Sequence, residues 1–72
     1  MQFDFDKLCG RIIEKYGTRE RFAEAMGRPS GWLSVRLNNR VHWDAEDIML
    51  AAELLDIAPA EIHVFFLTPK VR

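Results

Sequence analysis

The stretch from residue 18 to residue 39 restricts the fold more than any other part of this 72-residue chain. Thr18 can cap a helix, because its hydroxyl can accept a hydrogen bond from an otherwise unpaired amide of the first turn. Phe22, Ala23 and Met26 follow on one face at helical spacing. Gly27 can take the positive φ that ends a helix. The pattern therefore predicts a short helix that stops at a glycine turn.

A second short helix is predicted to start directly after this turn. Pro29 pushes the preceding residue out of the α region, and Ser30 is the expected N-cap. Leu33 and Leu37, four residues apart, form the inward face of this helix. The two asparagines at 38–39 can close it, because asparagine tolerates the left-handed conformation. Two short helices joined by a glycine turn, with a small alanine where they cross, are typical of a helix-turn-helix.

Three positions and the end of the second helix make this pattern resemble a known family. Ala23, Gly27 four residues later and Leu33 six residues beyond match the Ala, Gly and aliphatic positions of phage Cro and lambda-repressor-like domains, and the Leu-Asn-Asn-Arg ending at 37–40 is similar too. The likeness covers nearly the whole chain and is closest to small prophage-derived repressor-like proteins of Gram-positive bacteria. It implies an all-α, compact five-helix lambda-repressor-like bundle, with residues 30–38 as the recognition helix in the major groove of double-stranded DNA.

Periodicity and caps predict the remaining helices. One follows Asp6 as N-cap and runs to about Tyr16; another covers about 45–55 after the N-cap Asp44; a short fifth begins at Pro59. The predicted core comprises Leu8, Ile12, Tyr16, Phe22, Ala23, Met26, Leu33, Leu37, Ile48, Ala51, Leu55 and Ile62, with Cys9 and Ile13 on the apolar stripe of the first helix.

The chain is long enough for one domain, predicted at residues 1–67, followed by a loose tail at 68–72. Phe3 and Phe5 alternate with aspartates, which predicts an extended arm that packs one or both rings on the domain. The apolar residues Val64, Phe65, Phe66 and Leu67 either complete the core or form a subunit contact. We predict that they contribute to a two-fold homodimer.

Composition argues against several classes of protein. Cys9 is the single cysteine, so it can form no disulfide within the chain. No apolar run approaches the ~20 residues that a membrane span needs, and a cytoplasmic location is expected. One cysteine and two separated histidines give no metal-site spacing, and the dispersed glycines form no phosphate-binding loop. We therefore expect no enzyme, no metal and no cofactor.

Charge is divided unevenly along the chain, although the net charge is only −1. Residues 7–42 hold eight Lys and Arg against three Glu, a net charge of +5, whereas residues 43–67 hold six acidic residues and no Lys or Arg, a net charge of −6. The basic half contains the predicted helix-turn-helix. This division suits a protein that offers one face to phosphates, although an ordinary solvated surface can produce it as well.

The candidate DNA-binding residues fall into two groups. The predicted phosphate contacts are Arg19, Arg28, Arg36 and Arg40. The resemblance implies that Ser30, Gly31 and Val35 point into the groove, with Trp32 and Ser34 beside them. These residues offer few groups that can pair with base edges, so specificity would depend partly on DNA shape. Trp32 either stacks in the groove, anchors a protein partner, or rotates inward onto the preceding helix.

The sequence thus leads to two hypotheses from different classes. The first is a sequence-preferring double-stranded DNA-binding protein, a small phage- or prophage-type transcriptional regulator of the repressor-like kind. The alternative is a protein-binding module on the same fold, such as an antirepressor or another phage-encoded inhibitor, with Trp32 as its anchor. A purely structural or assembly domain is a third, weaker reading.

Overall fold

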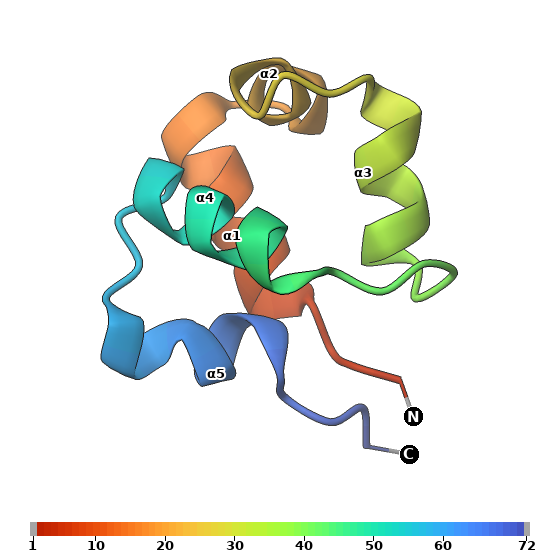
Figure 1. Cartoon of the computed structure of the whole chain (residues 1–72), viewed down its shortest axis with the longest axis vertical. Helices are drawn as coiled ribbons and strands as arrows, with labels where there is room; N and C mark the ends of the chain where they lie inside the picture. Colours follow the sequence, from red (N-terminus) through yellow and green to blue (C-terminus); the bar gives the residue numbers. More distant parts are fainter. Residues whose placement is uncertain (1, 72) are drawn as a thin grey trace.

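The structure, a computed structural model, describes residues 2–71, so Met1 of the predicted domain and Arg72 of the predicted tail lie outside it. The chain forms α1 (Asp6–Tyr16), α2 (Arg19–Ala25), α3 (Ser30–Leu37), α4 (Ala45–Leu54), a 3₁₀ turn η1 (Pro59–Glu61) and α5 (Ile62–Phe66) (Figure 1). Within residues 2–71 no strand is present, apart from one isolated bridge between Phe3 and Pro69. The predicted all-α, five-helix fold is confirmed.

Two of the predicted helix caps are present. The Thr18 hydroxyl accepts a hydrogen bond from the backbone N–H of Arg21 at 3.1 Å and so begins α2. The Asp44 carboxylate accepts from the backbone N–H of Asp47 at 2.9 Å and so begins α4. Each oxygen satisfies one of the amides that a helix N-terminus leaves without a partner.

Two other predicted N-caps are wrong, each by one residue. Ser30 is the first residue of α3, because the extended backbone of Pro29 already occupies the N-cap position, and no side chain caps this helix. Asp6 is the first residue of α1, whose N-cap is Phe5. There the Asp4 carboxylate accepts from the backbone N–H of Asp6 at 2.8 Å. The acid that stabilises the start of α1 is therefore Asp4.

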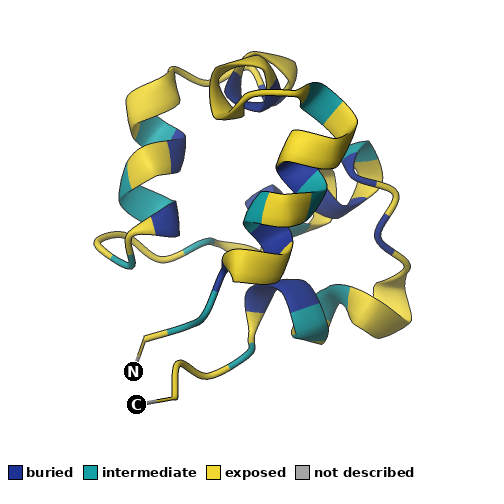
Figure 2. Ribbon diagram, turned by 180° about the vertical axis from the view of Figure 1, so that it is seen from behind, coloured by how far each residue is buried: buried dark blue, intermediate teal, exposed yellow. Residues whose placement is uncertain are grey.

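One core lies between the inward faces of the helices, and their outward faces are exposed (Figure 2). The buried residues are Phe5, Leu8, Ile12, Phe22, Ala23, Met26, Leu33, Leu37, Ala51, Ala52, Leu55, Ile57, Phe65 and Phe66. Tyr16, Ile48 and Ile62, which were predicted as core, are half-buried and pack against its edge. Ile13 is 49% exposed, because it is turned by about 100° from its buried neighbour Ile12.

The apolar segment near the C-terminus belongs to the core of its own chain. Phe65 and Phe66 are only 5% and 2% exposed, and the Phe66 ring meets the Trp43 ring edge-on with 5.1 Å between centroids. The predicted homodimer contact is therefore wrong for both phenylalanines, since neither ring is available to a second subunit. Val64 is half-buried, and Leu67 is 49% exposed.

The two ends of the domain run side by side (Figure 1). The backbone N–H of Asp4 donates to the carbonyl of Thr68 at 2.8 Å, and that of Lys70 donates to the carbonyl of Gln2 at 2.9 Å. The predicted loose tail at 68–72 is thus paired with the N-terminal arm as far as Lys70.

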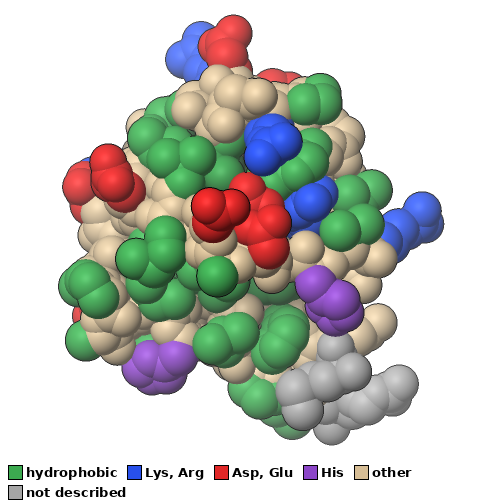
Figure 3. All heavy atoms as spheres, viewed as in Figure 1, with side chains coloured by type: hydrophobic (Ala, Val, Ile, Leu, Met, Phe, Trp, Pro, Cys, Tyr) green, Lys and Arg blue, Asp and Glu red, His purple; other side chains and the backbone are tan. Residues whose placement is uncertain are grey.

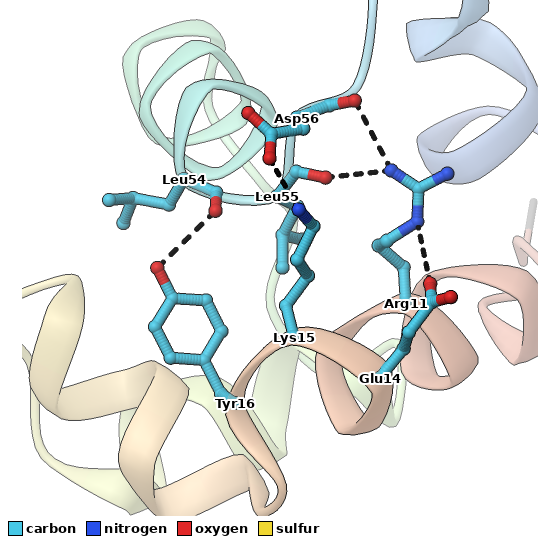
Figure 4. A network of polar contacts seen from close by, with 7 residues as sticks. All are labelled: Arg11, Glu14, Lys15, Tyr16, Leu54, Leu55 and Asp56. Atoms are coloured by element: carbon cyan, nitrogen blue, oxygen red, sulfur yellow. Dashed lines mark hydrogen bonds and ion pairs between the residues drawn. The ribbon is translucent and has the colours of Figure 1, made fainter.

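Three polar side chains of α1 reach the carbonyl end of α4: Arg11, Lys15 and Tyr16 (Figure 4). Arg11 Nη1 donates to the carbonyls of Leu55 at 2.7 Å and Asp56 at 3.2 Å, and Lys15 pairs with the Asp56 carboxylate. The Tyr16 hydroxyl donates to the carbonyl of the last α4 residue at 3.3 Å. Because carbonyls at a helix C-terminus lack intrahelical partners, these donors complete α4. Two cations of the basic half are therefore used inside the fold.

Candidate functional site

The turn between α2 and α3 has the geometry that the sequence predicted. Gly27 has a φ of 75°, and its backbone N–H donates to the carbonyl of Glu24 at 2.9 Å. The next N–H, that of Arg28, donates to the carbonyl of Ala23 at 2.9 Å. This pair of bonds is a Schellman motif, which ends α2 at a residue that must tolerate positive φ. Helices α2 and α3 thus form a helix-turn-helix.

Asn39 fixes the other end of α3. Its φ of 63° confirms the predicted left-handed stop. The side-chain N–H of Asn39 donates to the carbonyl of Phe3 at 3.0 Å, and the side-chain oxygen of Asn39 accepts from the backbone N–H of Phe3 at 2.9 Å. The N-terminal arm therefore holds α3 at its C-terminal end, as the turn at Gly27 does at its start.

The outward face of α3 carries small groups. Ser30, Gly31 and Ser34 are exposed, and Val35 is half-buried. A Cβ added at Gly31 would meet nothing within 4 Å, so the fold does not require glycine there. Bidentate recognition of a base edge needs long donors or acceptors such as Arg, Asn or Gln. None of the exposed residues of α3 itself is of this kind, and the exposed Asn38 lies just beyond its C-terminal end.

Trp32, which was predicted beside the groove, is half-buried and turned toward the interior. Its ring meets the Trp43 ring at 5.6 Å between centroids with an interplanar angle of 82°, and Trp43 contacts Phe66 in the same way. Of the three predicted alternatives, the inward one describes this position, but the neighbour is Trp43 and not the preceding helix. Trp43 has a structural role, since its ring contacts both Trp32 and Phe66.

Two of the four predicted phosphate contacts stack on this same tryptophan. The guanidinium groups of Arg28 and Arg36 lie 5.2 Å and 4.1 Å from the centre of the Trp32 ring. Arg36 Nη1 also donates to the Trp32 carbonyl at 3.1 Å, and Arg28 Nη2 lies 3.6 Å from the carboxylate of Asp47. Cation–π stacking holds both side chains against the protein, together with the ion pair at Arg28 and the hydrogen bond at Arg36. The Arg36 side chain is half-buried, whereas the Arg28 side chain is still 49% exposed.

Asp47 is the acidic group at the centre of this cluster and is buried. Burial raises the pKa of the Asp47 carboxyl, and the neighbouring Asp44 carboxylate raises it further, whereas Arg28 and Arg36 oppose the shift. Nothing local in the sequence shows that arginines from the preceding turn and helix lie near Asp47. Asp47 links the start of α4 to the turn between α2 and α3.

Arg19 and Arg40, the other two predicted phosphate contacts, are exposed. Arg19 Nη2 lies 3.5 Å from Cys9 Sγ, a weak contact that opposes the rise that burial causes in the thiol pKa. Arg40 forms no ion pair with any residue between 2 and 71. Three of the four predicted phosphate contacts are thus exposed, but Arg28 already has partners within the protein.

The outward face of α4 is a surface that the sequence reasoning missed. Met49 and Leu50 are 56% and 41% exposed, and Glu46 and Glu53 are exposed on either side of them. In Figure 3 acidic side chains lie over the middle of this view, hydrophobic ones lie to their left and below, and Lys and Arg lie mainly toward α2 and α3. The signal was present in the five consecutive apolar residues 48–52, since one helix cannot turn five successive side chains inward.

Residues 2–71 contain no group of three or more His, Cys, Asp or Glu placed to hold a metal ion. An apolar hollow of about 40 Å³ lies between the arm, Trp43 and α5, room for only a few water molecules. In the same part of the chain, no helix has the length and apolar character needed to cross a membrane.

The fold and the surface define a small helix-turn-helix domain. By sequence, the chain belongs to the family described as Protein of unknown function (DUF739), whose profile matches residues 1–69. The predicted resemblance was to Cro and lambda-repressor-like domains, but the matching family is DUF739, and this match does not support membership of the Cro and lambda-repressor family.

The chain is also similar to a solved structure, that of the modulator of repression (MOR) of the temperate bacteriophage TP901-1 from Lactococcus lactis. The two are 38% identical, the match covers 100% of this chain and 97% of that one, and the TM-score is 0.84. No curated protein matches the chain.

Proposed function

We propose that this protein is a phage regulator that modulates repression by binding a repressor protein, and that it does not read DNA sequence. The observation that carries the proposal is the chemistry of α3. The helix sits where a recognition helix would, yet its exposed residues Ser30, Gly31 and Ser34 cannot make bidentate contacts to bases. Specificity for an operator would need such contacts or a strong response to DNA shape.

The arginines and the similarity to MOR support the same proposal. Arg28 and Arg36 are held on the Trp32 ring, so two cations predicted for phosphates already have partners. The MOR protein, 38% identical over the full chain, is named as a modulator of repression. The proposed role is a binding role without catalysis, and its partner is the repressor encoded by the same phage or prophage.

Direct DNA binding remains the second candidate, because the helix-turn-helix geometry is intact and Arg19 and Arg40 are exposed at its two ends. In this alternative the protein would attach through phosphates and would depend on salt as counterion release requires.

One titration separates the two candidates. A fluorescent operator duplex is titrated with the repressor, alone and with increasing amounts of this protein, and also with this protein alone. The protein alone should leave the anisotropy of the duplex unchanged, and it should shift the apparent affinity of the repressor for its operator by about tenfold or more, that is by about 1.4 kcal/mol.

The contrary results are equally clear. Binding of the protein itself to the duplex, weakening steeply between about 50 and about 200 mM salt, would support the DNA-binding candidate. A repressor–operator curve that ignores the protein would overturn the proposed function.

A further inference from the structure

We propose that the outward face of α4, formed by Glu46, Met49, Leu50 and Glu53, docks the protein partner, and that the docking surface of this partner is a basic, amphipathic helix. The inference deepens the proposed function and rests on it for the identity of the partner. It places the contact on α4 and not on the helix-turn-helix, where the sequence had directed attention.

The apolar centre of this face does not serve the fold. Helix α4 packs on the core through Ala51 and Ala52, and Leu55 follows on the same side. Met49 and Leu50 point away from that side and keep 56% and 41% of their surface exposed. A helix that merely faces solvent carries polar residues at such positions. Two adjacent large apolar side chains there provide contact area that becomes buried only when another molecule covers it.

Helical spacing makes the four residues one patch. Glu46 precedes Met49 and Leu50 by three and four positions, and Glu53 follows them by four and three. Residues at these separations are neighbours on a helix surface. An apolar centre between charged ends is the arrangement in which central residues supply most of the binding energy and a polar rim excludes water.

The charge of the patch selects the kind of partner. Residues 43–67 contain no Lys or Arg, and Arg28, which approaches this helix from the α2–α3 turn, is occupied by Asp47 and the Trp32 ring. Glu46 and Glu53 would repel the phosphates of a nucleic acid and of an anionic membrane. A protein surface with Lys or Arg around an apolar strip complements the patch in both respects. An amphipathic helix can present such a surface, and one of similar length to α4, about 15 Å for ten residues, would cover the patch.

Two pairs of substitutions test the two properties of the patch. Met49→Ser with Leu50→Ser removes the apolar centre, and Glu46→Gln with Glu53→Gln removes the charge. The first pair should weaken repressor binding by about tenfold or more, because central apolar contacts dominate an interface. The second should weaken it by a few-fold and reduce its salt dependence, because rim charges act mainly through association rate.

Matched controls are available elsewhere on the surface. Ile13→Ser removes an apolar side chain that is 49% exposed on α1, and Glu20→Gln with Glu24→Gln neutralises two exposed acids on α2. Both controls should bind like the unchanged protein. If the unchanged protein binds the repressor and both α4 pairs bind equally well, the inference is wrong while the proposed function stands.

A second measurement keeps the inference testable if the repressor is not the partner. An amphipathic helical peptide of Lys and Leu, and a matched one of Glu and Leu, are titrated into ¹⁵N-labelled protein. Only the basic peptide should shift backbone amide resonances, mainly those of residues 45–54, and the Met49→Ser, Leu50→Ser protein should lose this response. Shifts confined to α1–α3, equal responses to both peptides or no response would overturn the inference.

Discussion

Helices α3 and α4 are both held firmly by the domain, but their outward faces have opposite chemistry. On α3 the exposed groups are two serines and a glycine, and the nearest arginines are stacked on Trp32. On α4 two large apolar side chains lie between two glutamates. A helix-turn-helix can therefore keep its geometry while the groups best suited to an intermolecular contact lie on the next helix.

Phe66→Ala should have the largest effect, because both faces depend on the same core. The ring is 2% exposed and contacts Trp43, which in turn contacts Trp32. Loss of a buried phenylalanine should lower the free energy of unfolding by about 3–5 kcal/mol, measured by urea denaturation. The midpoint should not depend on protein concentration. A denaturation midpoint that rises with protein concentration would instead indicate a dimer, against which the burial of Phe65 and Phe66 argues.

Trp32→Ala tests whether this residue belongs to the interior or to the binding surface. The half-buried ring supports Trp43 and two guanidinium groups, so the free energy of unfolding should fall by about 1–3 kcal/mol. Trp32→Phe should recover part of the loss. Repressor affinity of the folded fraction should stay close to that of the unchanged protein. Loss of binding with unchanged stability would make Trp32 the anchor and would break the contrast between the two faces.

Gly31→Ala tests whether the exposed face of α3 takes part in binding. The added methyl group meets nothing within 4 Å, and alanine is favoured over glycine in a helix, so unfolding should cost about 0.5–1 kcal/mol more. Gly10→Ala on α1, where a Cβ also meets nothing, is the matched control. Partner binding should be unaffected by either change. If Gly31→Ala alone abolishes binding, the α3 backbone must approach the ligand closely.

The pairing of Lys15 with Asp56 should have the smallest effect, since it lies away from both faces. The hydrogen bond and charge of Lys15 hold the pKa of the Asp56 carboxyl below its ordinary value. A carboxyl whose folded pKa is lowered stabilises the fold above its unfolded pKa of about 3.9, and this contribution is lost as pH falls through the folded pKa.

Asp56→Asn provides the measurement. Asparagine tolerates the positive φ of 54° at this position, so the change removes the charge with little backbone cost. The melting temperature of the variant should lie slightly below that of the unchanged protein near neutral pH, and the gap should close as pH is lowered through about 4 toward about 2. A gap that widens in acid would contradict the direction of the pKa shift.

The sequence predicted those features that depend on neighbouring residues. The Thr18 and Asp44 caps, the glycine turn at Gly27 and the left-handed Asn39 each follow from local chemistry, and all are present. The Ser30 cap failed for an equally local reason, since Pro29 occupies the N-cap position.

Features that depend on how helices meet were not accessible in the same way. The stacking of Arg28 and Arg36 on Trp32, and the burial of Asp47 beside them, require the relative placement of α3 and α4. The α4 face was missed for a different reason. Met49 and Leu50 were left out of the predicted core and were given no other role, although a run of five apolar residues exceeds what one helix face can bury.

The contrast between the two faces is tested most directly by site-specific photocrosslinking. A photoreactive amino acid is placed at Leu50 on α4 or at Ser34 on α3, both exposed, and each protein is irradiated with the repressor and its operator duplex present. The account predicts a crosslink from position 50 to the repressor and none from position 34 to DNA. A crosslink from position 34 to the duplex, with position 50 unreactive, would contradict it.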